Sequence, residues 1–243
     1  MSRFFVNPED IRSDRIVLTG ENANHVKVLR MKPGEAVTVC DANGTDYFCT
    51  ITEVQAGQVT LAVERQEASC SEPKARVSIY MAYAKSDKLE HVIQKATELG
   101  AYEIVAFPSS RCVSRPDDKS LAKKSDRWQK IAASAAEQSG RGRIPQIVTV
   151  GSYKEAVERA VQCALAVNCY ENEEDLSLSA VLEGGIPETV ALMTGPEGGY
   201  TQEEIDFSAA KGMKICTLGK RILRCETAPL CALSALMFAA GEF

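Results

Sequence analysis

Residues 189–204 read T-V-A-L-M-T-G-P-E-G-G-Y-T-Q-E-E, an order of residue types that specifies a strand, a glycine-rich loop and a helix start. The apolar run 189–194 is typical of a buried strand. Thr201, followed three residues later by Glu204, has the spacing of a helix-capping pair. A buried strand that leads through a short loop into a helix is the repeating unit of a parallel sheet covered by helices.

The same alternation extends over the C-terminal two thirds of the chain. We expect helices at 87–99, at 121–138, from 201 and from about 227. The strands that we expect between them cover residues 77–83, 103–107, 161–168, 189–194 and 213–218. The pattern predicts an α/β fold with a mostly parallel sheet.

The N-terminal part has a different pattern, made of short strands and turn signals. Asn43-Gly44 and Gly57 mark hairpin turns. Strand candidates cover residues 4–6, 16–19, 37–41, 47–54 and 59–63, which predicts a small β-barrel. The polar stretch 67–76 contains Pro73 and is typical of a linker. Because 243 residues are enough for two domains, we expect one domain at 1–70 and a second at 74–243.

Charge is unevenly distributed along a chain whose net charge is −5. Residues 73–150 carry 14 basic and 8 acidic side chains, whereas the flanking segments are acidic. A basic surface of this kind can hold the phosphates of a nucleic acid. The alternative is a solvated helix face with no ligand.

Other features of the composition exclude several classes of protein. No run of 18 apolar residues is present, so we expect no transmembrane helix, and the first residues show no secretory signal. The nine cysteines form no C-x-x-C pair, which favours reduced thiols in a cytoplasmic protein. Neither these cysteines nor the two histidines have zinc-ligand spacing, so we expect no metal.

Two loops carry the residues suited to chemistry. The first, 194–200, contains three glycines that permit close approach of the backbone to a ligand, and it presents Glu197. The second, 218–228, places Arg224 and Glu226 two residues apart at a helix start. Neither loop matches the dinucleotide or nucleotide-triphosphate fingerprints. The alternatives are a structural turn for the first loop and a structural ion pair for the second.

The last helix, A-P-L-C-A-L-S-A-L-M-F-A-A at 228–240, has no charged residue. A helix on the surface of a monomer normally shows a polar face. We therefore expect this helix to be buried on two sides, with a second copy of the chain as the simplest partner. The alternative is a core helix of a larger monomer.

The sequence also resembles a known family. G-P-E-G-G at 195–199 and L-G-x-x-I-L-R-x-E-T-A at 218–228 resemble the signature loops of SPOUT-class, S-adenosylmethionine-dependent RNA methyltransferases. The whole chain is similar to the bacterial 16S ribosomal RNA uridine N3 methyltransferases. That similarity rests on R-F-F-V at 3–6, H-V-x-V-L-R-M-x-x-G at 25–34, K-x-D-K-x-E at 85–90, Q-K-A-T-E-L-G at 94–100, R-W-x-K-I at 127–131 and A-x-E-Q-S-x-R at 135–141.

The resemblance implies a fold, a cofactor and partners. It implies a PUA-like RNA-binding barrel followed by a SPOUT domain with a trefoil knot, which is rare among folds. It also implies a homodimer that acts on one uridine of 16S ribosomal RNA, within the small ribosomal subunit. The implied S-adenosylmethionine-binding residues are Thr194, Gly195, Pro196, Gly198, Leu218, Gly219, Ile222, Leu223, Thr227 and Ala228.

The expected chemistry is an in-line methyl transfer to N3 of uracil after its proton leaves. Arg224 is permanently protonated and suited to stabilise the uracil anion, while Glu197 or Glu226 accepts the proton or orients Arg224. We interpret Cys225 as a packing residue, because thiolate adducts activate C5 of pyrimidines and not N3. The basic residues that we expect to contact RNA are Arg3, Arg30, Arg111, Arg115, Lys123, Arg127, Arg141 and Arg143.

The sequence is also compatible with two other functions. The chain could be a ribosome-assembly factor that binds RNA without catalysis, which calorimetry with S-adenosylmethionine would distinguish. It could also be a SPOUT enzyme that methylates another RNA, such as the 2′-hydroxyl of a transfer RNA.

Overall fold

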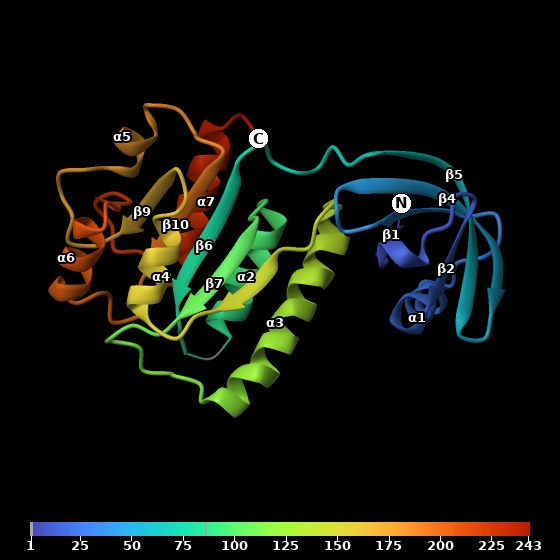
Figure 1. Cartoon of the computed structure of the whole chain (residues 1–243), viewed down its shortest axis with the longest axis horizontal. Coiled ribbons are helices and arrows are strands. Elements are labelled where there is room, and N and C mark those ends of the chain that lie inside the picture. The colour runs from blue at the N-terminus through green and yellow to red at the C-terminus, as the bar shows by residue number, and fades with distance from the viewer. Residues whose placement is uncertain (1, 86) are drawn as a thin grey trace. The chain divides into compact units, whose positions relative to one another are not determined.

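A computed structural model describes residues 2–85 and 87–243 (Figure 1). The chain divides into two compact units, each described here by itself. The first comprises Met1–Glu72 with Ala136–Ile144, and the second comprises Pro73–Ala135 with Pro145–Phe243. The change from one unit to the other at Glu72 and Pro73 falls inside the polar stretch 67–76.

The first unit is a curled, half-barrel sheet of five strands. Its order is β1-β3-β4-β5-β2, with β1 parallel to β3 and the other pairs antiparallel. Its core includes Phe4, Ile16, Leu18, Val39 and Leu61, and its form confirms the prediction of a small barrel-like β-unit. The elements are β1 (Ser2–Phe5), a 3-10 turn (Pro8–Asp10), β2 (Arg15–Thr19), α1 (Gly20–Val28), β3 (Ala36–Cys40), β4 (Thr45–Gln55) and β5 (Gln58–Ala68).

Two parts of this unit were not predicted from the sequence. Helix α1 begins at a glycine and includes two asparagines, so its intrinsic helix propensity is low. It is held by tertiary packing of Ala23 and Val26, which are buried in the core of the unit. Residues 136–144 also belong here, and their Arg141 side chain is 3% exposed and donates to Glu72 at 3.1 and 2.5 Å.

The second unit is built on a parallel sheet of six strands in the order β11-β9-β10-β6-β7-β8. The parallel sheet confirms the predicted α/β class. Its elements are β6 (Arg76–Ala82), α2 (Lys88–Glu98), β7 (Glu103–Phe107), α3 (Asp118–Ser139), β8 (Gln146–Thr149), α4 (Tyr153–Ala160), β9 (Leu165–Cys169), α5 (Leu178–Leu182), β10 (Thr189–Thr194), α6 (Gln202–Ala210), β11 (Lys214–Cys216) and α7 (Thr227–Ala239).

Helices cover both faces of this sheet. Helix α7 packs against β6, β10 and α2, whereas α4 packs against β7, β10 and α6 (Figure 1). The sequence pattern missed β8, α4 and α5 because each has only four to eight residues, too few for a periodicity to be recognised. Across residues 2–85 and 87–243, no helix combines the length and the apolar character that a membrane crossing needs.

The order of the strands sets the position of a ligand site. From β6 the chain first adds β7 and β8 on one side, and it then places β10, β9 and β11 on the other side. The direction of winding therefore reverses between β6 and β10. In open α/β sheets, ligands bind beyond the carboxyl ends of the strands at such a switch point.

The loop that follows β10 is anchored by Glu204 at the start of α6. The predicted capping pair is confirmed, because Thr201 and Glu204 each accept a hydrogen bond from the other's backbone N–H. The carboxylate also accepts a hydrogen bond from the backbone N–H of Ser110, at 2.8 Å, and Glu204 is buried. One side chain thus ties the loop after β7 to the loop after β10.

We expect Glu204→Ala to lower the free energy of unfolding by about 1–3 kcal/mol, because two backbone N–H groups lose their acceptor. Urea unfolding followed by circular dichroism measures this change. Gln202→Ala is the matched control on the exposed face of the same helix and should change stability by less than about 0.5 kcal/mol. Equal stability of the two variants would contradict the anchoring role of Glu204.

Candidate active site

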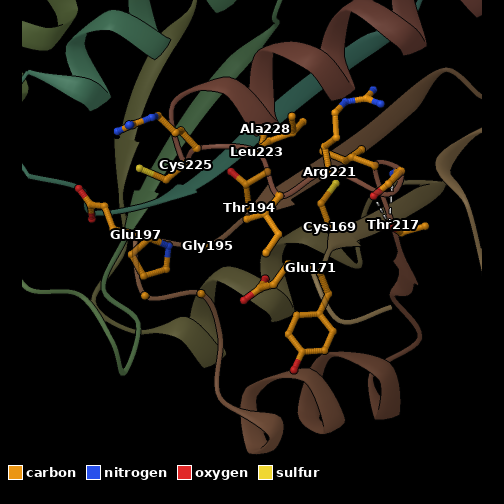
Figure 2. A pocket seen from close by; sticks show the side chains of 18 of the residues that line it. Cys169, Glu171, Thr194, Gly195, Glu197, Thr217, Arg221, Leu223, Cys225 and Ala228 are labelled. Atoms are coloured by element: carbon orange, nitrogen blue, oxygen red, sulfur yellow. Dashed lines mark hydrogen bonds between the residues drawn. The ribbon is translucent and has the colours of Figure 1, made fainter. Parts of the chain in front are cut away.

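A cavity of about 450 Å³ lies where the strands of the second unit end (Figure 2). Its walls come from the segments after β9, β10 and β11 and from the start of α2. The volume is in the range of pockets that hold small molecules or cofactors. The cavity therefore lies at the switch point of the sheet.

Both of the loops that the sequence singled out line this one cavity. The first contributes Thr194, Gly195, Pro196, Glu197 and Gly198. The second contributes Leu218, Gly219, Ile222, Leu223, Arg224 and Ala228. Two of the expected site residues, Glu226 and Thr227, are not among the described residues that line it. Figure 2 shows Thr194 and Leu223 close together in the middle of the view.

Eight further lining residues were not expected from the sequence. Some come from segments outside the two loops, after β9 and at the start of α2, and their contribution depends on the strand order, which a sequence pattern does not reveal. The others are neighbours of expected residues. The eight are Lys88, Cys169, Tyr170, Glu171, Gly199, Thr217, Arg221 and Cys225.

The cavity has polar groups that are available to a ligand. The Thr194 side chain lines it and is 1% exposed, and the Thr194 hydroxyl has no hydrogen-bond partner within the described chain. A buried hydroxyl without a partner is costly, which indicates that a ligand completes it. Gly199 has φ +66°, and a Cβ there would clash with the Glu171 carboxylate. Glycine at 199 therefore lets the Glu171 carboxylate approach the loop.

Lys88 joins the two loops through their carboxylates. Its Nζ lies 3.2 Å from Oε1 of Glu197 and 3.3 Å from Oε2 of Glu226. Oε1 of Glu197 also accepts a hydrogen bond from the backbone N–H of Lys85 at 2.9 Å. The Cys225 thiol donates to Oε2 of Glu226 at 3.2 Å.

These contacts determine the charges at the site. Partial burial opposes the ammonium of Lys88, but its hydrogen bonds to Glu197 and Glu226 outweigh that effect and raise the pKa of Lys88. Partial burial raises the pKa of Glu197, yet hydrogen bonds from the Lys85 backbone and from Lys88 bring it below the ordinary value. For Glu226 the burial effect is likewise outweighed, by backbone, Cys225 and Lys88 hydrogen bonds, so its pKa is lowered. Both carboxylates are therefore ionised and Lys88 is charged at neutral pH.

Cys225 lies in the cavity wall as a thiol. Burial, followed by its hydrogen bond to Glu226, raises the pKa of Cys225 to about 12. A thiol with this pKa is a poor nucleophile, since the thiolate is the reactive form. This supports the interpretation of Cys225 as a packing residue.

Arg224 lines the cavity with an exposed side chain. Its backbone carbonyl accepts hydrogen bonds from the N–H groups of Thr227 and Ala228, at 2.8 and 2.9 Å, and thereby fixes the start of α7. In the part of the chain that the structure describes, no carboxylate lies within ion-pair distance of its guanidinium. The structure therefore does not contain the Arg224–Glu226 ion pair that was the alternative interpretation, and Glu226 binds Lys88 instead.

The expected RNA-contacting residues occupy different environments. Arg30, Arg111, Arg115, Lys123 and Arg127 are exposed. On α3, Lys119, Lys123, Arg127 and Lys130 follow one another at helical spacing and form one stripe, which we call the α3 basic stripe. Arg127 also contacts Glu90 at 2.7 Å, with 69% of its side chain exposed.

Three arginines of the expected RNA-contacting set, Arg3, Arg141 and Arg143, are not exposed. Arg3 binds both carboxylate oxygens of Asp46, at 2.6 and 2.7 Å, and Arg141 is buried on Glu72. Arg143 is half-buried and has interactions of its own. Arg111 donates to the carbonyl oxygen of Gly198 at 3.0 Å, which places it beside the first loop.

Within residues 2–85 and 87–243, no three His, Cys, Asp or Glu side chains are grouped so that they could hold a metal ion. The lining of the cavity offers backbone groups, carboxylates and cations to a ligand.

Comparisons with known proteins agree with this geometry. Residues 71–237 match the family described as RNA methyltransferase domain, and residues 18–64 match the RNA methyltransferase PUA domain. The chain is 36% identical to ribosomal RNA small subunit methyltransferase E of Bacillus subtilis over 227 residues, covering 91% of this chain and 89% of that protein.

Solved structures extend the similarity to three dimensions. A ribosomal RNA small subunit methyltransferase E from Neisseria gonorrhoeae, bound to S-adenosyl methionine, is 30% identical with a TM-score of 0.85, and covers 98% of this chain and 97% of that one. A Legionella pneumophila protein in complex with the cofactor SAM has a TM-score of 0.87 at 30% identity, with 98% and 97% coverage. Sequence and fold thus agree over nearly the whole length, and the chain belongs to the RNA methyltransferase family that includes ribosomal RNA small subunit methyltransferase E.

Proposed function

We propose that this chain methylates N3 of one uridine of 16S ribosomal RNA, with S-adenosylmethionine as methyl donor, in the small ribosomal subunit of the cytoplasm. The observation that carries this proposal is that both signature loops line one cavity at the switch point of the sheet. Family membership, the names of the relatives and the cofactor in two similar structures support it. The trefoil knot that the resemblance implies stays a prediction.

The cavity suits the donor molecule in three respects. Its volume of about 450 Å³ is adequate, the Thr194 hydroxyl lacks a partner, and Glu171 and Glu197 complement a positively charged ligand. When bound, S-adenosylmethionine supplies a methyl group on a positively charged sulfur. The residues that we propose hold it are Thr194, Gly195, Pro196, Gly198, Leu218, Gly219, Ile222, Leu223 and Ala228. Thr227 is left out, because it is not among the described residues that line the cavity.

The remaining residues of the cavity act on the uracil. Loss of the N3 proton spreads negative charge onto the flanking carbonyl oxygens, and the unpaired guanidinium of Arg224 donates hydrogen bonds to that anion. Glu197 lines the cavity as a carboxylate and is our candidate for the proton acceptor, a weak base because its pKa is lowered. Glu226 lies outside the lining residues, so we assign it to holding Lys88.

RNA binding is assigned to exposed cations. The α3 basic stripe, with Arg111 and Arg115 on the preceding loop, would contact phosphates, and Arg30 would do so from the PUA-like unit. Arg3 and Arg141 are left out of this surface, because each side chain is at most 12% exposed and binds a carboxylate, whereas the Arg127 side chain on Glu90 is 69% exposed.

A homodimer is proposed from the outer face of α7. Ala232, Leu233, Leu236 and Met237 are fully buried against the chain's own sheet and α2, whereas Phe238 on the opposite face is 73% exposed. Cys231 and Ala235 are exposed on the same helix at helical spacing from Phe238, and an exposed apolar face of this kind is typical of a contact with a second copy.

The function is tested in a deletion strain by mass spectrometry of its 16S ribosomal RNA. We expect one N3-methyluridine to be lost on deletion and to return with the wild-type gene. Complementation with Arg224→Ala should give methyl transfer about 10²–10³-fold slower than with the wild-type gene. This is the usual cost of removing a donor that stabilises a developing anion.

Lys220→Ala, on the same loop but outside the cavity lining, is the matched control and should restore the methyl group. Calorimetry should show that the Arg224 variant still binds S-adenosylmethionine. An unchanged 16S RNA after deletion would refute the proposed substrate, and full activity of Arg224→Ala would remove that residue from the reaction.

Charge reversal on α3 tests the RNA surface. Lys123→Glu with Arg127→Glu should weaken binding of a 16S RNA fragment by about 10–100-fold at low salt and reduce the salt slope by about 2, because phosphate contacts are lost. Affinity for S-adenosylmethionine should not change. Lys154→Glu with Lys211→Glu is the control with an equal charge change on α4 and after α6, and an equal loss in the control would argue against a specific stripe.

Phe238→Glu tests the dimer. We expect wild-type protein to sediment as a dimer and the variant as a folded monomer, because burying a carboxylate in an apolar interface is costly. Val113→Glu, at another exposed apolar side chain, should leave the dimer intact. A wild-type chain that sediments as a monomer would contradict the proposed interface.

A further inference from the structure

We propose that Lys88 is a positioning residue that binds the carboxylates of Glu197 and Glu226 and thereby keeps Arg224 free to bind the uracil anion. This inference rests on the proposed function and adds the residue that keeps the Arg224 guanidinium unpaired.

Lys88 connects segments that are distant in the chain. It is the first residue of α2, and it reaches Glu197 in the loop after β10 and Glu226 at the start of α7. The Lys88 Nζ also lies 3.7 Å from Sγ of Cys225, the residue that stands between Arg224 and Glu226 in the sequence. A single ammonium group therefore faces both acidic side chains of the two signature loops.

Arg224 competes for the same carboxylates. It precedes Glu226 by two residues and lines the same cavity as Glu197 and Lys88. A guanidinium forms strong, often bidentate, hydrogen bonds with a carboxylate and would be held by either one. Such a pair would remove the donors that the uracil anion needs.

The observed contacts compete with that pairing. Oε1 of Glu197 accepts from Lys88 and from the Lys85 backbone, and Oε2 of Glu226 accepts from Lys88 and from the Cys225 thiol. Within the described residues the Arg224 side chain has no ionic or hydrogen-bonded partner. The raised pKa of Lys88 and the lowered pKa values of both carboxylates agree with a stable triad of charges.

Loss of the Lys88 charge would leave two ionised carboxylates with no shared cation. Apart from Lys88, the cations that line the cavity are Arg221 and Arg224, and Arg224 is the nearer of the two to Glu226 in the sequence. We therefore expect Lys88→Met to pair Arg224 with Glu226 and to lower the catalytic rate, with little effect on cofactor binding.

The experiment compares Lys88→Met, Lys88→Arg and the double variant Lys88→Met with Glu226→Gln. Lys95→Met is the matched control, since Lys95 lies on the same helix and pairs with Glu98 away from the cavity. Methyl transfer to small ribosomal subunits gives kcat and KM, and calorimetry gives the affinity for S-adenosylmethionine. Modification by phenylglyoxal, followed by mass spectrometry, reports whether the Arg224 guanidinium is free.

In Lys88→Met we expect kcat to fall about 10–100-fold with KM and cofactor affinity nearly unchanged, the sign of an interaction made in the transition state. Arg224 should become less reactive toward phenylglyoxal. Lys88→Arg should keep most activity. Adding Glu226→Gln to Lys88→Met should recover about tenfold, since one of the two competing carboxylates is then neutral and the other, Glu197, is still held by the Lys85 backbone N–H. Should Lys88→Met fail to fold, Lys88→Gln is compared in the same way.

Two results would overturn the inference. One is unchanged Arg224 reactivity in Lys88→Met, and the other is a kcat loss that Glu226→Gln does not recover. The modification assay does not depend on methyl transfer. If the wild-type protein left 16S RNA unmethylated, only the proposed function would be refuted, and the assay would still test the role of Lys88.

Discussion

The parallel pairing of β10 between β6 and β9 is the constraint on which the site depends. It brings the carboxyl ends of β9, β10 and β11 to one edge of the sheet, so the segments that leave them must share one space. The cavity of about 450 Å³ is that space. Each loop taken alone is an ordinary turn between a strand and a helix, and only their adjacency encloses a volume suited to a cofactor.

Charge inside the cavity is arranged by hydrogen bonds. Glu197 and Glu226 are kept ionised by backbone and lysine donors, whereas burial keeps Cys225 protonated. Covalent chemistry through the thiol is therefore disfavoured, and the role that we propose for Arg224 is electrostatic. Catalysis of this kind needs rigid placement of charges, which the capping box at Thr201 and Glu204 and the Lys88 contacts both provide.

The surface separates two electrostatic roles. The chain has a net charge of −5, yet α3 carries cations at successive turns of one face. An acidic protein with a local basic stripe can hold RNA phosphates there while its overall charge limits unspecific binding. The buried Arg141 looks the same in the sequence, but its side chain binds Glu72 within the fold.

Much of this protein was readable from residue order, because strand, loop and helix signals are local. The parallel sheet, the capping pair at Thr201 and Glu204, and the two loops were predicted in this way. Lys88, Glu171 and Cys169 were not, because their place in the cavity depends on which strands are neighbours. Local periodicity carries no information on strand order. Nor does it show that Arg141 is buried on Glu72, or that Lys88 rather than Arg224 binds Glu226, because these partners are distant in the sequence. Tertiary packing alone decided which charges are paired within the protein and which are not.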